Sequence, residues 1–183
     1  MSKVATRFPL AQAMPWAQAA ANACADLSSA VHIAGSIRRQ RDEVGDIDLV
    51  VLDDGENPWL RQQIGMRLAV EGYRQTKDGE HIATFTREGT PSLDLYYATP
   101  DTWGITMLVR TGSAAHNIKL TQVARRMLPV RQLKVSRGIV DTADRVIASR
   151  TEEEIFAALG TPFVRPEDRE APEYESWIRE DGE

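Results

Sequence analysis

Short alternating or apolar runs, separated by polar turns, dominate the first half of the chain. Where acidic and apolar residues alternate, as they do from Asp46 to Leu49, successive side chains point to opposite faces, which is the period of a β-strand. The same alternation recurs from Ser92 to Ala98, and Asp78-Gly79-Glu80 is a hairpin signal between two shorter runs. The strands expected from these patterns span residues 30–34, 46–53, 73–77, 81–87 and 92–98.

Between and after these strands, apolar residues recur at helical spacing. Ser36 is expected at or near the N-cap of a short helical turn over 36–40, and Thr151 is expected to cap the last helix. Two further short strands are expected within 131–140. The longer helices are expected over residues 9–28, 58–71, 100–111, 113–127 and 152–159.

Strands and helices mixed in this way predict an α+β fold. The plausible domain boundary lies near residues 99–112. We therefore expect a first domain over 1–99, a second over 100–170, and an acidic, proline-broken tail over 171–183 in which Trp177 is a candidate anchor.

Asp46 and Asp48 carry the first candidate chemistry, because strand periodicity places both carboxylates on one face. Like charges so close together are costly unless a cation lies between them. Mg²⁺ prefers carboxylate oxygens and substrate phosphates, so this pair predicts a magnesium site. The alternative is a strand with a solvated acidic face.

Gly35-Ser36 follows the first predicted strand, and three arginines follow it at Arg38, Arg39 and Arg41. A Gly-Ser turn after a strand frees backbone N–H groups that can hold phosphate, and the arginines add positive charge. A phosphate site and a metal site are therefore expected close together in the sequence.

The stretch Gly35-Ser36-x-Arg38-Arg39-x-x-x-Glu43-x-Gly45-Asp46-Ile47-Asp48 resembles the active-site signature of the family X DNA polymerases, which belong to the polymerase β nucleotidyltransferase superfamily. The bacterial members are the most similar. The resemblance covers roughly residues 8–170. It implies a polymerase β-like palm with a mixed or antiparallel sheet, followed by a small α+β thumb, without helix–hairpin–helix modules or a phosphoesterase domain.

The resemblance also implies roles for individual residues. Asp94, alone on its strand face, corresponds to a third catalytic, metal-binding carboxylate beside Asp46 and Asp48. Ser36 and Arg39, with the backbone at Gly35 and Gly45, are implied to bind the β- and γ-phosphates. Ser92 stands where animal members often have a basic residue.

Residues 110–117 resemble the T-G-S-x-x-x-N motif at the palm–thumb junction of the family. The motif implies a nucleotide pocket formed by Thr111, Gly112, Ser113 and Asn117, with Gly112 approaching the sugar and base and Asn117 bonding the base edge. The alternative is a helix–turn–helix corner capped by Ser113. Val109 and Arg110 replace the usual aromatic residue before the motif, and Thr121 replaces a frequent basic residue after it.

Charge is distributed unevenly along the chain, whose net charge is −5. Residues 110–150 hold nine basic residues against two acidic ones, whereas residues 151–183 hold eleven acidic residues against three arginines. Because screening confines fields to about 10 Å, the local basic segment matters more to a polyanion than the total does. The expected nucleic-acid contacts are Lys119, Arg125, Arg126, Lys134 and Arg137.

From the sequence we therefore expect an enzyme that uses Mg²⁺, with Mn²⁺ as a substitute, to add dNTPs to a primer 3′ hydroxyl in gapped or primed DNA. Alternatives are a nucleotidyltransferase of the same fold acting on RNA, protein or a nucleotide, and a catalytically silent DNA-binding protein. The single cysteine, Cys24, fits a reducing cytoplasm. No signal peptide or membrane segment is expected, and we expect a monomer.

Overall fold

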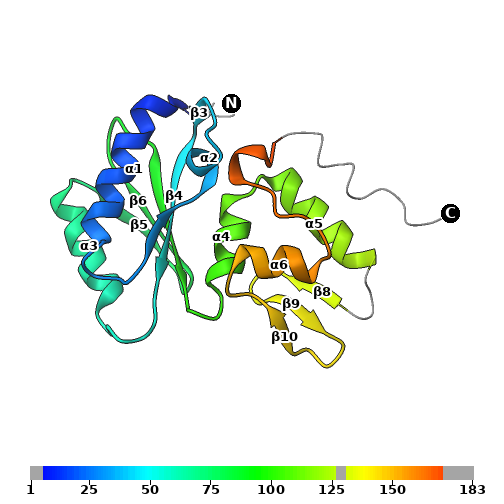
Figure 1. Cartoon of the computed structure of the whole chain (residues 1–183). Coiled ribbons are helices and arrows are strands. Elements are labelled where there is room, and N and C mark those ends of the chain that lie inside the picture. The colour runs from blue at the N-terminus through cyan, green and yellow to red at the C-terminus, as the bar shows by residue number, and fades with distance from the viewer. Residues whose placement is uncertain (1–5, 127–130, 171–183) are drawn as a thin grey trace. The chain divides into compact units, whose positions relative to one another are not determined.

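The computed structural model describes residues 6–126 and 131–170, and the chain forms two compact units divided between Pro100 and Asp101 (Figure 1). The acidic tail over 171–183, with Trp177, lies outside the described residues. Each unit combines helices and strands, and the sheet of the first unit contains both parallel and antiparallel pairs. This confirms the expected α+β class.

A five-stranded sheet with the order β2-β4-β7-β6-β5 forms the centre of the first unit. Strands β4 and β7 are parallel neighbours, whereas the other adjacent strands are antiparallel. The strands are β2 (Val31–Ile33), β4 (Asp46–Leu52), β5 (Arg74–Asp78), β6 (Ile82–Thr86) and β7 (Ser92–Ala98).

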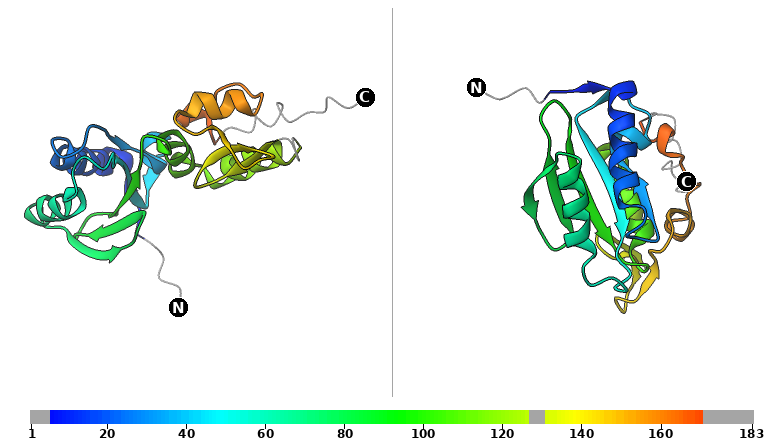
Figure 2. Two further views of the ribbon diagram at one scale, coloured as in Figure 1. Left: turned by 90° about the horizontal axis from the view of Figure 1, so that it is seen from below. Right: turned by 90° about the vertical axis from the view of Figure 1, so that its left-hand side faces the viewer.

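Helices α1 (Leu10–Cys24) and α3 (Leu60–Val70) lie together on one face of this sheet, as the right-hand view of Figure 2 shows. Alternate strand residues such as Leu49 and Leu95 point into the core under these helices and are fully buried. Since side chains alternate along a strand, Asp48 and Asp94 are directed to the opposite face. Pro15 lies inside α1, which continues through it.

The four-residue helix α2 (Gly35–Arg38) connects β2 to a short ribbon before β4. Its N-cap is Ala34, so Ser36, which was expected at or near the N-cap, lies two residues after it, and the helix has no side-chain cap hydrogen bond. The ribbon pairs β1 (Phe8–Pro9) with β3 (Glu43–Val44). These two-residue strands are too short to show periodicity, and the sequence did not indicate them.

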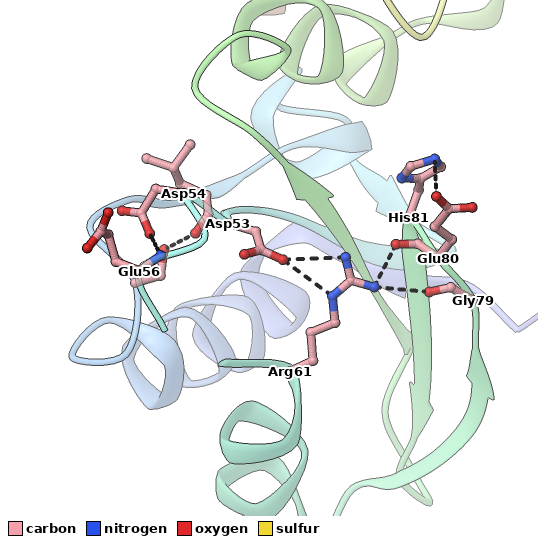
Figure 3. Close-up of polar contacts among 9 residues, drawn as sticks. Asp53, Asp54, Glu56, Arg61, Gly79, Glu80 and His81 are labelled. Atoms are coloured by element: carbon pink, nitrogen blue, oxygen red, sulfur yellow. Dashed lines mark hydrogen bonds and ion pairs between the residues drawn. The ribbon is translucent and has the colours of Figure 1, made fainter. Parts of the chain in front are cut away.

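Arg61 joins several elements at the end of the sheet where β4 ends (Figure 3). Its guanidinium lies 3.4 Å from Oδ2 of Asp53 and donates to the carbonyl of Glu80 at 2.6 Å. The same group lies 4.3 Å from the centre of the Tyr97 ring. Arg61 therefore ties α3 to the end of β4, to the β5–β6 turn and to β7, and Asp53 has a structural partner.

The second unit begins with two helices, continues with a three-stranded antiparallel sheet of order β10-β9-β8, and ends with one α-helix and a 3₁₀ turn. Ile105, Ile139 and Phe156 lie fully buried in its core. Thr151 caps the last helix by accepting from the N–H of Glu154, as expected. The elements are α4 (Trp103–Thr111), α5 (Ala114–Arg126), β8 (Arg131–Lys134), β9 (Gly138–Asp141), β10 (Val146–Ala148), α6 (Glu152–Ala158) and η1 (Pro166–Asp168).

A buried ion pair closes the second unit. Arg169 is fully buried, and its Nη1 lies 2.8 Å from Oε1 of Glu152, which is 7% exposed. The guanidinium also donates two hydrogen bonds to the carbonyl of Val164 and lies over the ring of Phe156. The pair therefore holds the chain after α6 against the unit's core.

Candidate metal and nucleotide site

The parallel pairing of β4 with β7 brings the three predicted carboxylates together. Asp48 is the direct neighbour of Asp94, and Asp46 is the neighbour of Ser92. One carboxylate oxygen from each of Asp46, Asp48 and Asp94 lies within 4.8 Å of the others. Two strands far apart in the sequence thus place three oxygen ligands where a single cation can touch all of them.

The carboxylates disturb one another because like charges lie close together in a partly buried place. Burial, followed by the charges of Asp46 and Asp94, raises the pKa of Asp48 to about 7. Loss of hydration and then the charge of Asp94 raise the pKa of Asp46. The positive charge of Arg39 partly opposes both shifts. An added divalent cation would relieve this repulsion directly.

Asp94 has one oxygen with a partner and one without. Its Oδ2 lies 3.4 Å from the hydroxyl of Tyr96, while its buried Oδ1 has no hydrogen-bond partner within the described parts of the chain. Because buried polar atoms are nearly always paired, the orphaned Oδ1 marks a position for a ligand. An all-oxygen set with such an atom fits a hard divalent cation such as Mg²⁺ or Mn²⁺.

Gly35 lies directly against Asp48. Its φ is +58°, and a Cβ built on it would lie 1.8 Å from Oδ2 of Asp48. The backbone N–H of Ala34 donates to the carbonyl of Asp48 at 2.8 Å, so the turn is fastened to β4. Glycine is therefore required here for both its backbone conformation and its lack of a side chain.

The other predicted phosphate-binding residues lie around this turn. Ser36 has a buried Oγ with no partner among the described residues, which is consistent with a ligand-facing hydroxyl. Arg39 is half-buried and lies near enough to the carboxylates to favour their ionised forms. A Cβ on Gly45 would meet no atom within 4 Å, so space does not demand glycine at that position.

The predicted T-G-S corner lies in the second unit, between α4 and α5. The Ser113 hydroxyl accepts from the N–H of His116 at 3.3 Å, which makes it a cap of α5, and the bond from Gly112 to Ser113 is cis. Asn117 donates to the carbonyl of Val109 at 2.9 Å, while its Oδ1 is buried without a partner in the described structure. Asn117 thus ties the two helices together, and one polar atom is left for another contact. Thr111 is the last residue of α4.

The five predicted nucleic-acid contacts fall into two groups. Lys119, Arg125 and Arg126 lie on α5, where the two arginines are exposed. Lys134 and Arg137 both form ion pairs with Asp144 on the sheet side of the unit. Asp144 therefore balances part of the positive charge of Lys134 and Arg137.

Tyr96 is the residue near the carboxylates that sequence reasoning did not assign to the site. It lies two residues after Asp94 on β7, and its hydroxyl hydrogen-bonds to Asp94 and also contributes a hydrogen bond to Asp48. Side chains two residues apart on a strand share a face, so the sequence already placed Tyr96 on the same face of β7 as Asp94. That shared face was the signal that could have assigned Tyr96 to the site. A tyrosine in an apolar strand is interpreted as a packing residue unless a hydrogen-bond partner of its hydroxyl is known.

The carboxylates and the Gly-Ser turn belong to the first unit, and the T-G-S corner and the basic residues belong to the second. Among the described residues, no helix is long and apolar enough to cross a membrane.

Comparison with known proteins identifies the second unit most directly, because residues 106–170 match the family model of the DNA polymerase beta thumb. The chain is 28% identical, over 172 residues that make up 90% of its length, to the DNA polymerase/3'-5' exonuclease PolX of Bacillus subtilis (strain 168). The aligned region is 29% of that relative, so the chain spans less than a third of its length. The chain thus resembles a bacterial family X DNA polymerase along most of its own length, and its second unit resembles the polymerase beta thumb.

Proposed function

We propose that this chain is a metal-dependent nucleotidyltransferase that adds dNTPs to the 3′ hydroxyl of a DNA primer, with short gaps as its substrate. The observation that carries the proposal is the cluster of Asp46, Asp48 and Asp94, whose ligand oxygens lie within 4.8 Å of one another. The relationship to family X polymerases supports DNA as the acceptor. In this proposal residues 1–99 form the palm and residues 100–170 form the thumb.

The first unit would hold the reacting groups. Bound Mg²⁺ or Mn²⁺ supplies charge stabilisation for the attacking and leaving oxygens of an in-line displacement. Asp46 and Asp48 would share ligation of both ions, and Asp94 would ligate the ion at the primer hydroxyl. Asp94 Oδ1, which has no partner within the described residues, is the atom available for that task.

Both units contain residues that we propose to contact the nucleotide. The Ser36 hydroxyl and Arg39, with the backbone at Gly35 and Gly45, would hold the β- and γ-phosphates beside the carboxylates. Thr111, Gly112, Ser113 and Asn117 would form the pocket for sugar and base. The orphaned Oδ1 of Asn117 supports a further polar contact at this corner.

The thumb would hold DNA through phosphate contacts from Lys119, Arg125 and Arg126, and more weakly from Lys134 and Arg137. Each phosphate contact releases counterions, so binding should weaken steeply with salt. Because Asp144 already pairs with Lys134 and Arg137, charge reversal on α5 should reduce the salt dependence more than charge reversal on the sheet.

The test is extension of a labelled primer on a one-nucleotide-gapped duplex, with each dNTP and rNTP, in Mg²⁺ and in Mn²⁺. Asp94→Asn should abolish extension, whereas Asp54→Asn, which changes an exposed carboxylate outside the cluster, should not. Nucleotide binding without incorporation into any primer would overturn the DNA polymerase assignment and direct attention to RNA, protein or nucleotide acceptors.

A further inference from the structure

Tyr96 places a single hydroxyl between the carboxylates of two strands. Along the β4–β7 pair, Tyr96 is the neighbour of Val50, one pair beyond Asp48 and Asp94. Its Oη lies 3.4 Å from Oδ2 of Asp94, and it also hydrogen-bonds with Asp48. The side chain is 8% exposed, so protein surrounds this contact and little water competes for it.

A tyrosine hydroxyl is suited to this position because it carries no charge and its one proton can be shared between the two neighbouring carboxylates. A donor directed at an ionised carboxylate makes a charge-assisted bond, which is about twice as strong as a neutral one. The three carboxylates lie within 4.8 Å of one another, so a neutral donor eases their repulsion without adding charge. A lysine or arginine there would instead compete with a cation for the same oxygens.

The contact also decides which oxygen of Asp94 is offered to a ligand. Oδ2 is held by Tyr96, while Oδ1 is buried and has no hydrogen-bond partner in the described chain. The neighbour of Asp94 on the other side is Thr84 of β6. Holding one oxygen therefore restricts the rotation of the carboxyl group and leaves the other oxygen open to a ligand.

We propose that Tyr96 is a positioning residue for the metal site: its hydroxyl holds Asp94 Oδ2 so that Oδ1 remains the metal ligand. The proposal rests on the proposed function only in taking the carboxylate cluster as a divalent cation site. Groups that orient metal ligands from behind typically change metal affinity or activity by 10–100-fold when removed. Tyr96 acts through Asp94 in this proposal.

The test compares Tyr96→Phe with Tyr97→Phe in the full chain, measuring Mn²⁺ binding by electron paramagnetic resonance. Both variants remove a phenol hydroxyl from β7, but Tyr97 points to the core face. Tyr96→Phe should weaken Mn²⁺ binding by about 10-fold, and Tyr97→Phe should leave it unchanged. If primer extension occurs, the Mn²⁺ concentration for half-maximal rate should rise likewise, with the dNTP KM unchanged at saturating metal.

The outcomes separate this proposal from the proposed function. Unchanged Mn²⁺ affinity in Tyr96→Phe overturns the role of Tyr96, whether or not the chain extends primers. A weakened affinity confined to Tyr96→Phe supports it, even in a protein with no polymerase activity. Equal weakening in both variants would show a general loss of packing in β7 and would also overturn the proposal.

Discussion

A methyl group on Gly35 would lie 1.8 Å from Oδ2 of Asp48. This distance is less than any non-bonded contact allows, so the Gly-Ser turn and Asp48 cannot both keep their positions if residue 35 has a side chain. The backbone φ of +58° adds strain for any L residue. The Gly-Ser turn predicted to bind phosphate and the strand predicted to bind metal are therefore packed directly against each other.

Gly35→Ala should displace Asp48 and reduce Mn²⁺ affinity by about 100-fold, at the upper end of what loss of ligand orientation costs. Isothermal titration with Mn²⁺ would measure the loss. Gly65→Ala on α3 is the control, because its Cβ would meet only the end of the Gln75 side chain, at 3.7 Å. That variant should bind Mn²⁺ normally. Normal binding by Gly35→Ala would mean that the turn and Asp48 move apart easily.

The raised pKa of Asp48, at about 7, predicts an unusual pH dependence of stability without metal. Between its unfolded value near 4 and its folded value, the folded state binds a proton that the unfolded state has lost. Stability in EDTA should therefore fall as the pH rises from about 4 to about 7. Thermal unfolding over this range would show it.

Divalent metal should reverse this trend, because only ionised carboxylates bind it. Added Mn²⁺ should raise Tm more at about pH 8 than at about pH 5. Asp48→Asn should remove most of the pH dependence seen in EDTA. A metal effect that is equal at both pH values would contradict binding at the three carboxylates.

The interactions of Arg61 predict a change in stability without a change in metal binding. Arg61→Met removes the pair with Asp53 and the bonds to the carbonyls of Gly79 and Glu80 (Figure 3). It also removes the contact with the Tyr97 ring. Since several partners are lost together, the cost should be about 1–3 kcal/mol in urea unfolding. Mn²⁺ affinity should not change, because Asp53 lies at the opposite end of β4 from Asp46.

Arg67→Met is the matched control for Arg61. Its single ion pair with Asp26 is exposed, with half or more of each side chain accessible, and such pairs contribute little. If Arg67→Met lowers the free energy of unfolding as much as Arg61→Met does, the contacts of Arg61 stabilise the fold no more than an exposed ion pair.

The buried pair of Arg169 and Glu152 predicts strong coupling in the second unit. Arg169→Met leaves Glu152 buried without its partner, and breaking such pairs costs about 3–5 kcal/mol. Adding Glu152→Leu should recover much of that loss, because the uncompensated charge is then gone. Urea unfolding of both single variants and the double variant would measure the coupling. If the stability losses of the two single variants simply add in the double variant, the two residues are not coupled.

Much of the fold follows from local patterns. Strand periodicity located β4 and β7 to within a residue, and placed Asp46, Asp48 and Asp94 on their proper faces. The Thr151 cap followed from a side chain and an N–H three residues apart. Signals of this kind depend on neighbours in the sequence, so one sequence is enough to find them.

Contacts between segments that are distant in the sequence could not be predicted from local patterns. Nothing local indicates that Tyr96 hydrogen-bonds the carboxylates, that Asp144 pairs with Lys134 and Arg137, or that Arg169 lies buried on Glu152. The ribbon of β1 and β3 was missed because two-residue strands have no period. These features depend on which segments meet, which only the folded structure shows.

The direct pairing of Asp48 with Asp94 has a consequence for how the chain folds. The two residues lie on parallel strands separated in sequence by a helix and a hairpin, so their contact requires a large loop to close first. Contacts of high sequence separation form slowly. A shift of β7 by one residue along β4 would turn Asp94 into the apolar core. The ability to bind a divalent ion should therefore arise late in refolding, and would report that β7 has docked in its native register.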